Sequence, residues 1–231
     1  MNTAAAFRPF QTSLAVQQLA EGLTFSLDNA LHPLSLLAVS ELQLHLKHQQ
    51  EWAGKMFGVL VVRTETGELG YLSAFSGKLA GENHHEGFVP PVFDGLVDGG
   101  FVNEGMTKLT RINEEINSPE TDAVQVELLK VLRKDHSTSL QYRIFEQYHF
   151  LNKLGESKSL IEIFGDRNPP AGAGECAGPK LLQYAYQHKM EPLALAEFWW
   201  GSSTRSDHWK HGEFYAPCRE KCSSILAHML S

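Results

Sequence analysis

Apolar residues recur along this chain with two different periods, and the period changes several times. Between Pro33 and Trp52 they return every three or four positions, which is typical of a helix with one buried face. The run 57–63 is instead apolar and rich in valine, and a similar run at 69–75 follows a turn that contains Gly67. Two such runs joined by a short turn predict a β-hairpin. Residues 59–62 do not alternate, which indicates a strand covered on both faces.

Residues 104–155 return to helical spacing, with charged residues between the apolar ones. The segment 117–120, which contains Pro119, interrupts this pattern. We therefore expect two helices, the second of them long, with helical intervals that continue to Leu151. The two helices would form an antiparallel hairpin that projects from the body of the protein.

The last part of the chain predicts a helix after Pro179, a buried strand at 192–200 and a final helix that carries Cys218 and Cys222 near its start. These elements together predict an α/β fold. Residues 1–103 would supply a helix and the β-hairpin of an α/β domain. Residues 104–155 would be an inserted helical hairpin. Residues 156–231 would add a cysteine-bearing helix, strand and helix to the same α/β domain.

Size and charge narrow the classes of protein that fit this pattern. The chain has 231 residues, 42% of them hydrophobic, which is enough for a sizeable core. A formal charge of −7 argues against a strongly basic nucleic-acid binder, although a local basic patch stays open. The sequence contains no apolar run of about 18 residues and no signal-peptide pattern at its start. With an odd number of cysteines, three, these features predict a cytoplasmic protein with no membrane partner.

The three cysteines are the strongest candidates for chemistry, because each lies where a turn leads into a predicted helix. Free N–H groups at a helix start stabilise a thiolate. Cys218 and Cys222 are four residues apart and would share one helical face, and Cys176 would join them from another helix. This arrangement predicts a three-sulfur site for zinc, with His208, His211 or a water as the fourth ligand. The alternative is that the cysteines are small buried hydrophobic residues.

Two groups of basic residues are candidates for contact with RNA. Arg133, Lys134 and Arg143 belong to the long predicted helix, and a second group surrounds the second cysteine segment: Arg205, Lys210, Arg219 and Lys221. The alternative is that these side chains only solvate helices and loops. The apolar positions of the helical hairpin could instead join two copies of the chain in a homo-oligomer; they are Leu128, Leu132, Ile144 and Leu151.

Six segments resemble the N-terminal region of long bacterial RluA-type pseudouridine synthases, and the resemblance covers nearly the whole chain: 54–62, 70–81, 88–94, 169–176, 196–201 and 218–230. In that family a separate catalytic domain follows and converts uridine to pseudouridine in ribosomal or transfer RNA. Its catalytic aspartate lies in an Arg-Leu-Asp motif, which this sequence lacks. The chain ends at Ser231, where the catalytic domain is expected to begin. The resemblance therefore implies an accessory domain that helps to bind RNA or to organise the enzyme.

A looser resemblance links the chain to zinc-dependent nucleoside and nucleobase deaminases. Cys176 is similar to the first metal ligand of that family, and Pro217, Cys218 and Cys222 are similar to its second motif, with one extra residue between the cysteines. Gly178 stands where a deaminase has its proton-transferring glutamate, and Glu175 is the nearest candidate to replace it. This resemblance implies a deaminase-like three-layer arrangement with an inserted helical hairpin. It leaves two further functions open, an active zinc deaminase and a structural zinc module.

Overall fold

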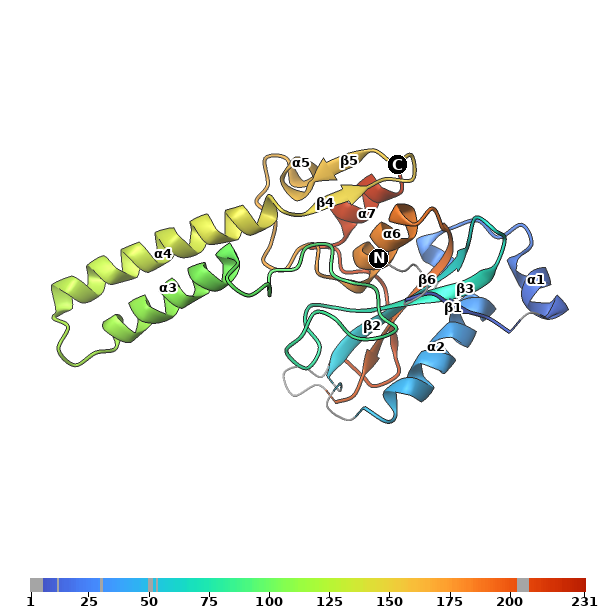
Figure 1. Cartoon of the computed structure of the whole chain (residues 1–231), viewed down its shortest axis with the longest axis horizontal. Coiled ribbons are helices and arrows are strands. Elements are labelled where there is room, and N and C mark those ends of the chain that lie inside the picture. The colour runs from blue at the N-terminus through green and yellow to red at the C-terminus, as the bar shows by residue number, and fades with distance from the viewer. Residues whose placement is uncertain (1–5, 12, 30, 50–51, 53, 203–207) are drawn as a thin grey trace.

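The computed structural model describes residues 6–11, 13–29, 31–49, 52, 54–202 and 208–231. The described residues form a mixed α/β body from which two helices project (Figure 1). In chain order the elements are β1 (Arg8–Pro9), α1 (Leu14–Ala20), the short 3-10 helix η1 (Leu27–Asn29), α2 (Pro33–Leu46), β2 (Lys55–Arg63), β3 (Leu69–Phe75), α3 (Phe101–Ile116), α4 (Ala123–Phe145), β4 (His149–Leu151), β5 (Ser157–Ser159), α5 (Leu160–Phe164), α6 (Ala177–Gln187), β6 (Glu191–Trp200), β7 (Phe214–Tyr215) and α7 (Ser223–Met229).

The central sheet has five strands in the order β1-β3-β2-β6-β7, and every pairing in it is antiparallel. The predicted β-hairpin is confirmed, since β2 pairs with β3 over the whole of β3. Strand β2 lies in the middle because β6, far along the sequence, pairs with its other edge. Val59 thus lies between Ser73 of β3 and Ala196 of β6.

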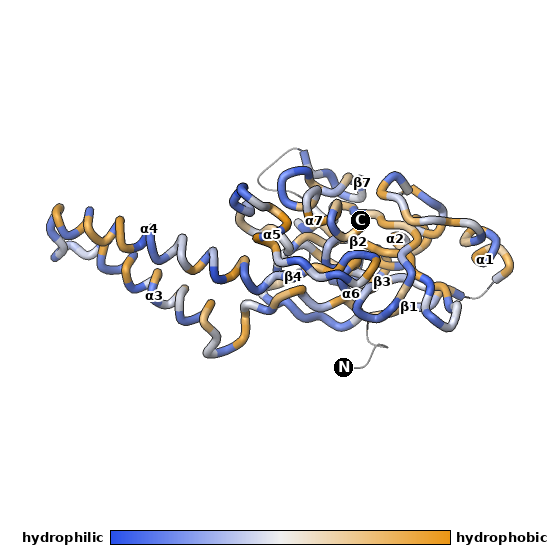
Figure 2. Tube along the Cα trace, turned by 90° about the horizontal axis from the view of Figure 1, so that it is seen from above, coloured by the Kyte–Doolittle hydropathy of each residue, from blue (hydrophilic) through white to orange (hydrophobic). Residues whose placement is uncertain are grey.

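Helices cover both faces of this sheet, which explains why β2 is apolar without alternation. Phe57, Val59 and Val61 pack in one hydrophobic cluster with α2, while Leu60 and Val62 pack in a second cluster with α6 and α7. Successive side chains of a strand point to opposite faces, so both faces of β2 are core. Figure 2 shows the hydrophobic stretches concentrated in this body, whereas the projecting helices alternate along their length.

The projecting part is a hairpin of α3 and α4. The two helices pack closely at Gly105, where an added Cβ would come within 2.7 Å of the Leu140 side chain. The hairpin leaves large apolar side chains exposed, including Leu128 and Leu132 at 61% and 48%. The prediction that helical structure continues to Leu151 was wrong. Helix α4 ends at Phe145, and Leu151 lies in β4, where it pairs with Ser157 of β5.

The small β4–β5 hairpin and α5 link this projecting part to the face of the sheet that α6 and α7 cover. Phe150 of β4 is fully buried, and its carbonyl oxygen lies 2.9 Å from Nε2 of the buried His228 in α7. Helix α5 begins with a capping box between Ser159 and Glu162. Within the described part of the chain, no helix combines the length and the apolar character needed to cross a membrane.

Candidate metal centre

The fold brings the three cysteines together from opposite ends of a long stretch of sequence. Cys176 is the N-cap residue of α6 and Cys222 is the N-cap residue of α7, and these two helices lie on the same face of the sheet. The three Sγ atoms all lie within 4.8 Å of one another, and those of Cys218 and Cys222 are 3.4 Å apart. The convergence expected from the sequence is present in the structure.

Two glycines shape the turn that delivers Cys176 to its helix. Gly172 and Gly174 have φ angles of +74° and +91°, which residues with a side chain rarely adopt. A Cβ on Gly174 would also lie 2.7 Å from the ring of Tyr148. The stretch before Cys176 can therefore turn tightly against the body only because these residues are glycine.

The second cysteine segment differs from the expectation in one respect. Helix α7 begins at Ser223, so Cys218 precedes it and only Cys222 stands at its start. A single helical turn comes first, in which the backbone N–H of Cys222 donates to the carbonyl oxygen of Cys218 at 3.1 Å. That turn still places the two sulfurs side by side, so the spacing of four residues has the effect that a helix would give.

The donor set fits a zinc ion. All three cysteines are free thiols rather than disulfide-bonded. Tetrahedral zinc with sulfur ligands at about 2.3 Å requires sulfurs about 3.8 Å apart. The Sγ atoms of Cys218 and Cys222, 3.4 Å apart, are close to that value, and all three sulfurs lie within 4.8 Å of one another. The Cys176 side chain forms no capping hydrogen bond with α6, so its sulfur is available as a ligand at the positive end of that helix.

Without a metal, the raised pKa values of Cys176 and Cys218 keep these two thiols protonated. Contact with Cys218 lowers the pKa of Cys176. Contact with Cys222, burial, and the charges of Cys222 and Glu197 outweigh this effect and raise the pKa to about 12. Contact with Cys176 and burial likewise raise the pKa of Cys218. A metal must displace these protons in order to bind, so binding at this centre would release protons to solution.

The two histidines considered as a fourth ligand have other contacts. Nδ1 of His211 accepts a hydrogen bond from the backbone N–H of Gly201 at 2.8 Å, and its ring lies 4.4 Å from that of Trp200. The ring of His208 contacts Trp209 and Tyr215. Among the described residues, no fourth His, Cys, Asp or Glu joins the cluster. Three protein ligands and one remaining position are typical of a catalytic zinc site more than of a structural one.

The sequence pattern did not predict a role for Glu197, a buried carboxyl group at this centre. Glu197 lies on β6 opposite Gly58, is only 6% exposed, and accepts a hydrogen bond at 2.9 Å from the backbone N–H of Gly178. Burial raises the pKa of Glu197 to about 7, although the Gly178 hydrogen bond lowers it in part. The signal was present in the sequence, because Glu197 is a single acidic residue inside the apolar run 193–200.

Glu175, the residue proposed to replace the deaminase glutamate, lies in a different environment. Its side chain is exposed, and Oε1 accepts a hydrogen bond from the Tyr148 hydroxyl at 3.3 Å. Glu175 also lines a cavity next to the centre, together with Lys180. The carboxyl groups of Glu175 and Glu197 therefore differ sharply in burial.

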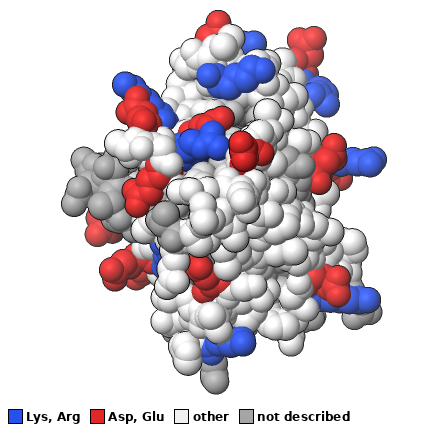
Figure 3. All heavy atoms as spheres, turned by 90° about the vertical axis from the view of Figure 1, so that its right-hand side faces the viewer, with Lys and Arg blue, Asp and Glu red and all other residues white. Residues whose placement is uncertain are grey.

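The basic residues considered for RNA contact fall into two separate groups. Arg133 and Lys134 are exposed on α4, whereas the guanidinium of Arg143 lies 4.5 Å from the centre of the Phe101 ring. Arg219 is exposed and Lys221 is partly buried, and both lie in the second cysteine segment with Lys210 just before it; Arg205 lies outside the described residues. Figure 1 places the middle of α4 well away from α7, so the two groups do not merge. On the face opposite the hairpin, basic and acidic side chains are interspersed (Figure 3).

Comparison of the chain with models of protein families, with characterised proteins and with solved structures finds no match.

Proposed function

We propose that this chain is a zinc-binding accessory domain of an RNA-modifying enzyme of the RluA pseudouridine synthase type. The observation that carries the zinc part is the convergence of three cysteines: Cys176 at the start of α6, Cys222 at the start of α7, and Cys218 in the turn before α7. A bound zinc ion would fasten these two helix starts to each other and so stabilise one side of the body. The RNA part rests on the resemblance of the six segments described above.

The order of elements supports a deaminase-like three-layer arrangement for this module. A β-hairpin is followed by a cysteine helix, then by a strand that pairs with the free edge of the hairpin, then by a second cysteine helix. Helix α2 covers the other face of the sheet. The α3–α4 hairpin enters between β3 and α6, so it is an insertion in this layout.

The zinc proposal is tested by metal analysis of the purified chain. We expect about one zinc per chain, and loss of that zinc in Cys176→Ser and Cys222→Ser. His211→Ala is the matched control. The His211 ring accepts a hydrogen bond from the Gly201 N–H, so we expect this substitution to leave the zinc content unchanged. A chain that binds no zinc under metal-replete conditions, or one that loses it in the His211 variant, would contradict the proposed ligand set.

The accessory role predicts that this chain alone makes no pseudouridine. The expected reason is the missing Arg-Leu-Asp tripeptide, which supplies the catalytic aspartate in the family it resembles. Incubation with ribosomal and transfer RNA, followed by mapping of pseudouridine, checks this expectation. Conversion at one specific uridine by the pure chain would overturn the accessory role.

A second candidate function is a zinc-dependent deaminase, and one observation favours it. The described residues supply three ligands and leave one position for a water, which zinc would activate as a nucleophile. Deaminases carry their glutamate at the helix position that Gly178 occupies here. The carboxyl of Glu197, which comes from β6, is hydrogen-bonded to the backbone N–H of Gly178 and so lies next to that position. Ammonia release from cytidine, adenosine or their bases, abolished in Glu197→Gln, would establish this function. No release by the zinc-loaded chain would leave the accessory role standing.

A further inference from the structure

Cys218 and Cys222 form a closely spaced pair of thiols within the metal centre. Their Sγ atoms are 3.4 Å apart, and neither sulfur belongs to a disulfide. The two residues share one turn, in which the backbone N–H of Cys222 donates to the carbonyl oxygen of Cys218 at 3.1 Å. A disulfide joins sulfurs about 2.05 Å apart, so an approach of roughly 1.4 Å would bring this pair to bonding distance.

The three thiols of the centre differ in their access to solvent. Cys218 is exposed, Cys176 is partly buried and Cys222 is only 1% exposed. An oxidant in solution therefore meets the sulfur of Cys218 first. Cysteines that respond to oxidation are typically accessible and lie beside a second cysteine that resolves the oxidised sulfur, which is the position of Cys222.

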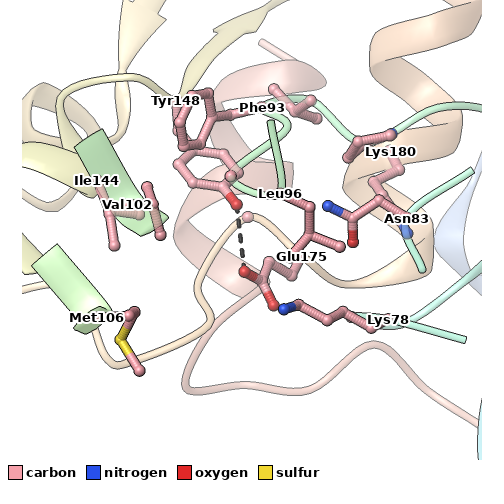
Figure 4. A pocket seen from close by; sticks show the side chains of 15 residues that line it. Lys78, Asn83, Phe93, Leu96, Val102, Met106, Ile144, Tyr148, Glu175 and Lys180 are labelled. Atoms are coloured by element: carbon pink, nitrogen blue, oxygen red, sulfur yellow. Dashed lines mark hydrogen bonds between the residues drawn. The ribbon is translucent and has the colours of Figure 1, made fainter. Parts of the chain in front are cut away.

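The chain on both sides of Cys176 is held in place by side-chain hydrogen bonds. The side chain of Glu175, just before it, points toward Tyr148 and accepts a hydrogen bond from the Tyr148 hydroxyl at 3.3 Å (Figure 4). Gly178, just after it, donates to the buried Glu197 at 2.9 Å. A disulfide to Cys176 would have to draw the starts of α6 and α7 together, whereas the close pair of thiols needs a change within a single turn.

Oxidation of this pair needs only a hydroperoxide as co-reactant. The sulfur of Cys218 attacks a peroxide oxygen as its thiolate, the O–O bond breaks, and a sulfenic acid and one water result. The sulfur of Cys222 then attacks the sulfenic sulfur, so that the S–S bond forms, the S–O bond breaks and a second water leaves. Two thiols and one hydrogen peroxide thus become one disulfide and two waters, and two electrons pass from the sulfurs to the peroxide oxygens.

We propose that Cys218 and Cys222 are a site of reversible oxidation, at which a hydroperoxide joins them in a disulfide while Cys176 stays a free thiol. The disulfide withdraws two of the three ligands of the metal centre. Protein zinc sites typically use three or more protein ligands, so oxidation would release the ion and unfasten the starts of α6 and α7. This release rests on the proposed function, whereas the formation of the disulfide does not.

The test is oxidation of the zinc-loaded chain with hydrogen peroxide, followed by alkylation of the remaining thiols and mass spectrometry. We expect a loss of two hydrogen atoms, alkylation of Cys176 alone and release of one zinc per disulfide. Trypsin cuts after Arg219 and Lys221, so only a disulfide can hold the peptides of Cys218 and Cys222 together. Dithiothreitol should restore the thiols and the binding of zinc.

Two variants that each lack one metal ligand form a matched pair. Cys176→Ser keeps the close pair of thiols, and Cys218→Ser removes its exposed member. Under the same conditions, Cys176→Ser should form its disulfide at least about tenfold faster than Cys218→Ser forms any. A disulfide that includes Cys176 in the wild type, a disulfide between two chains, or equal rates in the two variants would overturn the proposal.

The zinc proposal and this inference can fail separately. A chain that holds no zinc but forms the disulfide between Cys218 and Cys222 contradicts the zinc proposal and supports this inference. A chain that holds zinc and keeps all three thiols after treatment with peroxide supports the zinc proposal and overturns this inference.

Discussion

The carboxyl of Glu197 caps the N-terminus of α6, which the side chain of the N-cap residue Cys176 does not do. An N-cap side chain normally accepts a hydrogen bond from an N–H group in the first turn of its helix. Cys176 does not do so, and Glu197 accepts the Gly178 N–H from the neighbouring strand instead. Glu197 therefore both caps α6 and holds the backbone that carries the first metal ligand.

We expect Glu197→Leu to weaken zinc binding by at least tenfold and Glu197→Gln, which keeps an acceptor oxygen, to weaken it much less. Loss of a cap costs about 1 kcal/mol of stability in general, so a matched control is needed. Ser159→Ala removes the capping box of α5, away from the cysteines, and should lower the melting temperature without changing zinc affinity. Cobalt substitution followed by absorption spectroscopy provides the readout. Equal spectra and affinities in all three variants would make Glu197 a structural cap only.

The buried carboxyl also predicts a dependence of stability on pH. Burial raises the pKa of Glu197 from 4.5 to about 7, so the folded chain holds a proton there that the unfolded chain has lost. The stability contributed by this group is complete below pH 4.5 and is lost as the pH rises through about 7. The size of the effect is about 3 kcal/mol at most. Urea unfolding between these pH values should show a smaller decline in Glu197→Gln, and equal slopes would contradict the assignment.

For individual residues, the sequence pointed to the three cysteines as candidate ligands but did not indicate which side chains surround them. Each of the three cysteines comes just before an apolar run with helical spacing. Their convergence could therefore be predicted from the positions of the predicted helix starts. Glu197 was missed because its relation to Gly178 depends on which strand packs beneath α6, and periodicity does not contain that information. Lys180 was missed for the same reason, since its helix gives no sign that this position faces a cavity.

Close contact between α6 and β2 fixes the height of the cysteine helix above the sheet. A Cβ on Gly58 would lie 2.9 Å from Cβ of Ala177 and 3.1 Å from Cδ1 of Leu181. Ala177 directly follows Cys176, so any shift that relieves this crowding also moves the metal ligand. The absence of a side chain at Gly58 is therefore coupled to the geometry of the centre.

We expect Gly58→Ala to destabilise the chain by about 1–3 kcal/mol, the usual cost of overpacking, and to reduce zinc affinity. Ala177→Gly removes the atom that the new methyl group meets. The double variant should therefore lose less than the sum of the two single changes, as thermal or urea unfolding can measure. Strict additivity would mean that the two positions do not press on each other.

Helices and strands were predicted correctly where the sequence pattern agrees with the strand pairing, and incorrectly where a contact between distant residues sets the end of an element. The β2–β3 hairpin has a strong local signal, since a glycine turn joins two apolar runs. The end of α4 does not, because Tyr148 and Leu151 continue the helical spacing although the chain has already left the helix. Pairing of β4 with β5 decides that boundary, and its partner strand comes later in the sequence.

For the whole molecule, composition and spacing predicted a mixed α/β body with a helical insertion, and the structure has both. The antiparallel sheet order was not predictable from the sequence alone. It depends on β6 pairing with β2 across more than a hundred residues, and a loop closure of that length leaves no local pattern. The distribution of charge was likewise hidden, because a net charge of −7 says nothing about how far α4 lies from the second cysteine segment.

The separation of the two basic groups allows RNA contact by the hairpin to be tested alone. Arg133 and Lys134 are exposed on α4, whereas Arg143 packs on Phe101 and is best left intact. If the hairpin contacts phosphates, Arg133→Glu with Lys134→Glu should weaken binding to a ribosomal RNA stem-loop. It should also reduce the slope of log affinity against log salt by about 1.5, since each phosphate contact contributes about 0.7–0.9. Electrophoretic mobility shifts at several salt concentrations measure both quantities.

The matched control reverses Lys47 and Lys158, two exposed residues outside the hairpin, and changes the net charge by the same amount. Equal losses in both double variants would show a general effect of charge, and no loss in either would remove RNA contact from the hairpin. In that case the exposed apolar side chains of α4, Leu128 and Leu132 among them, become the feature to explain. Exposed apolar surface of this kind is typical of an interface. Sedimentation of the chain and of Leu128→Glu with Leu132→Glu would then show whether two copies associate through α4.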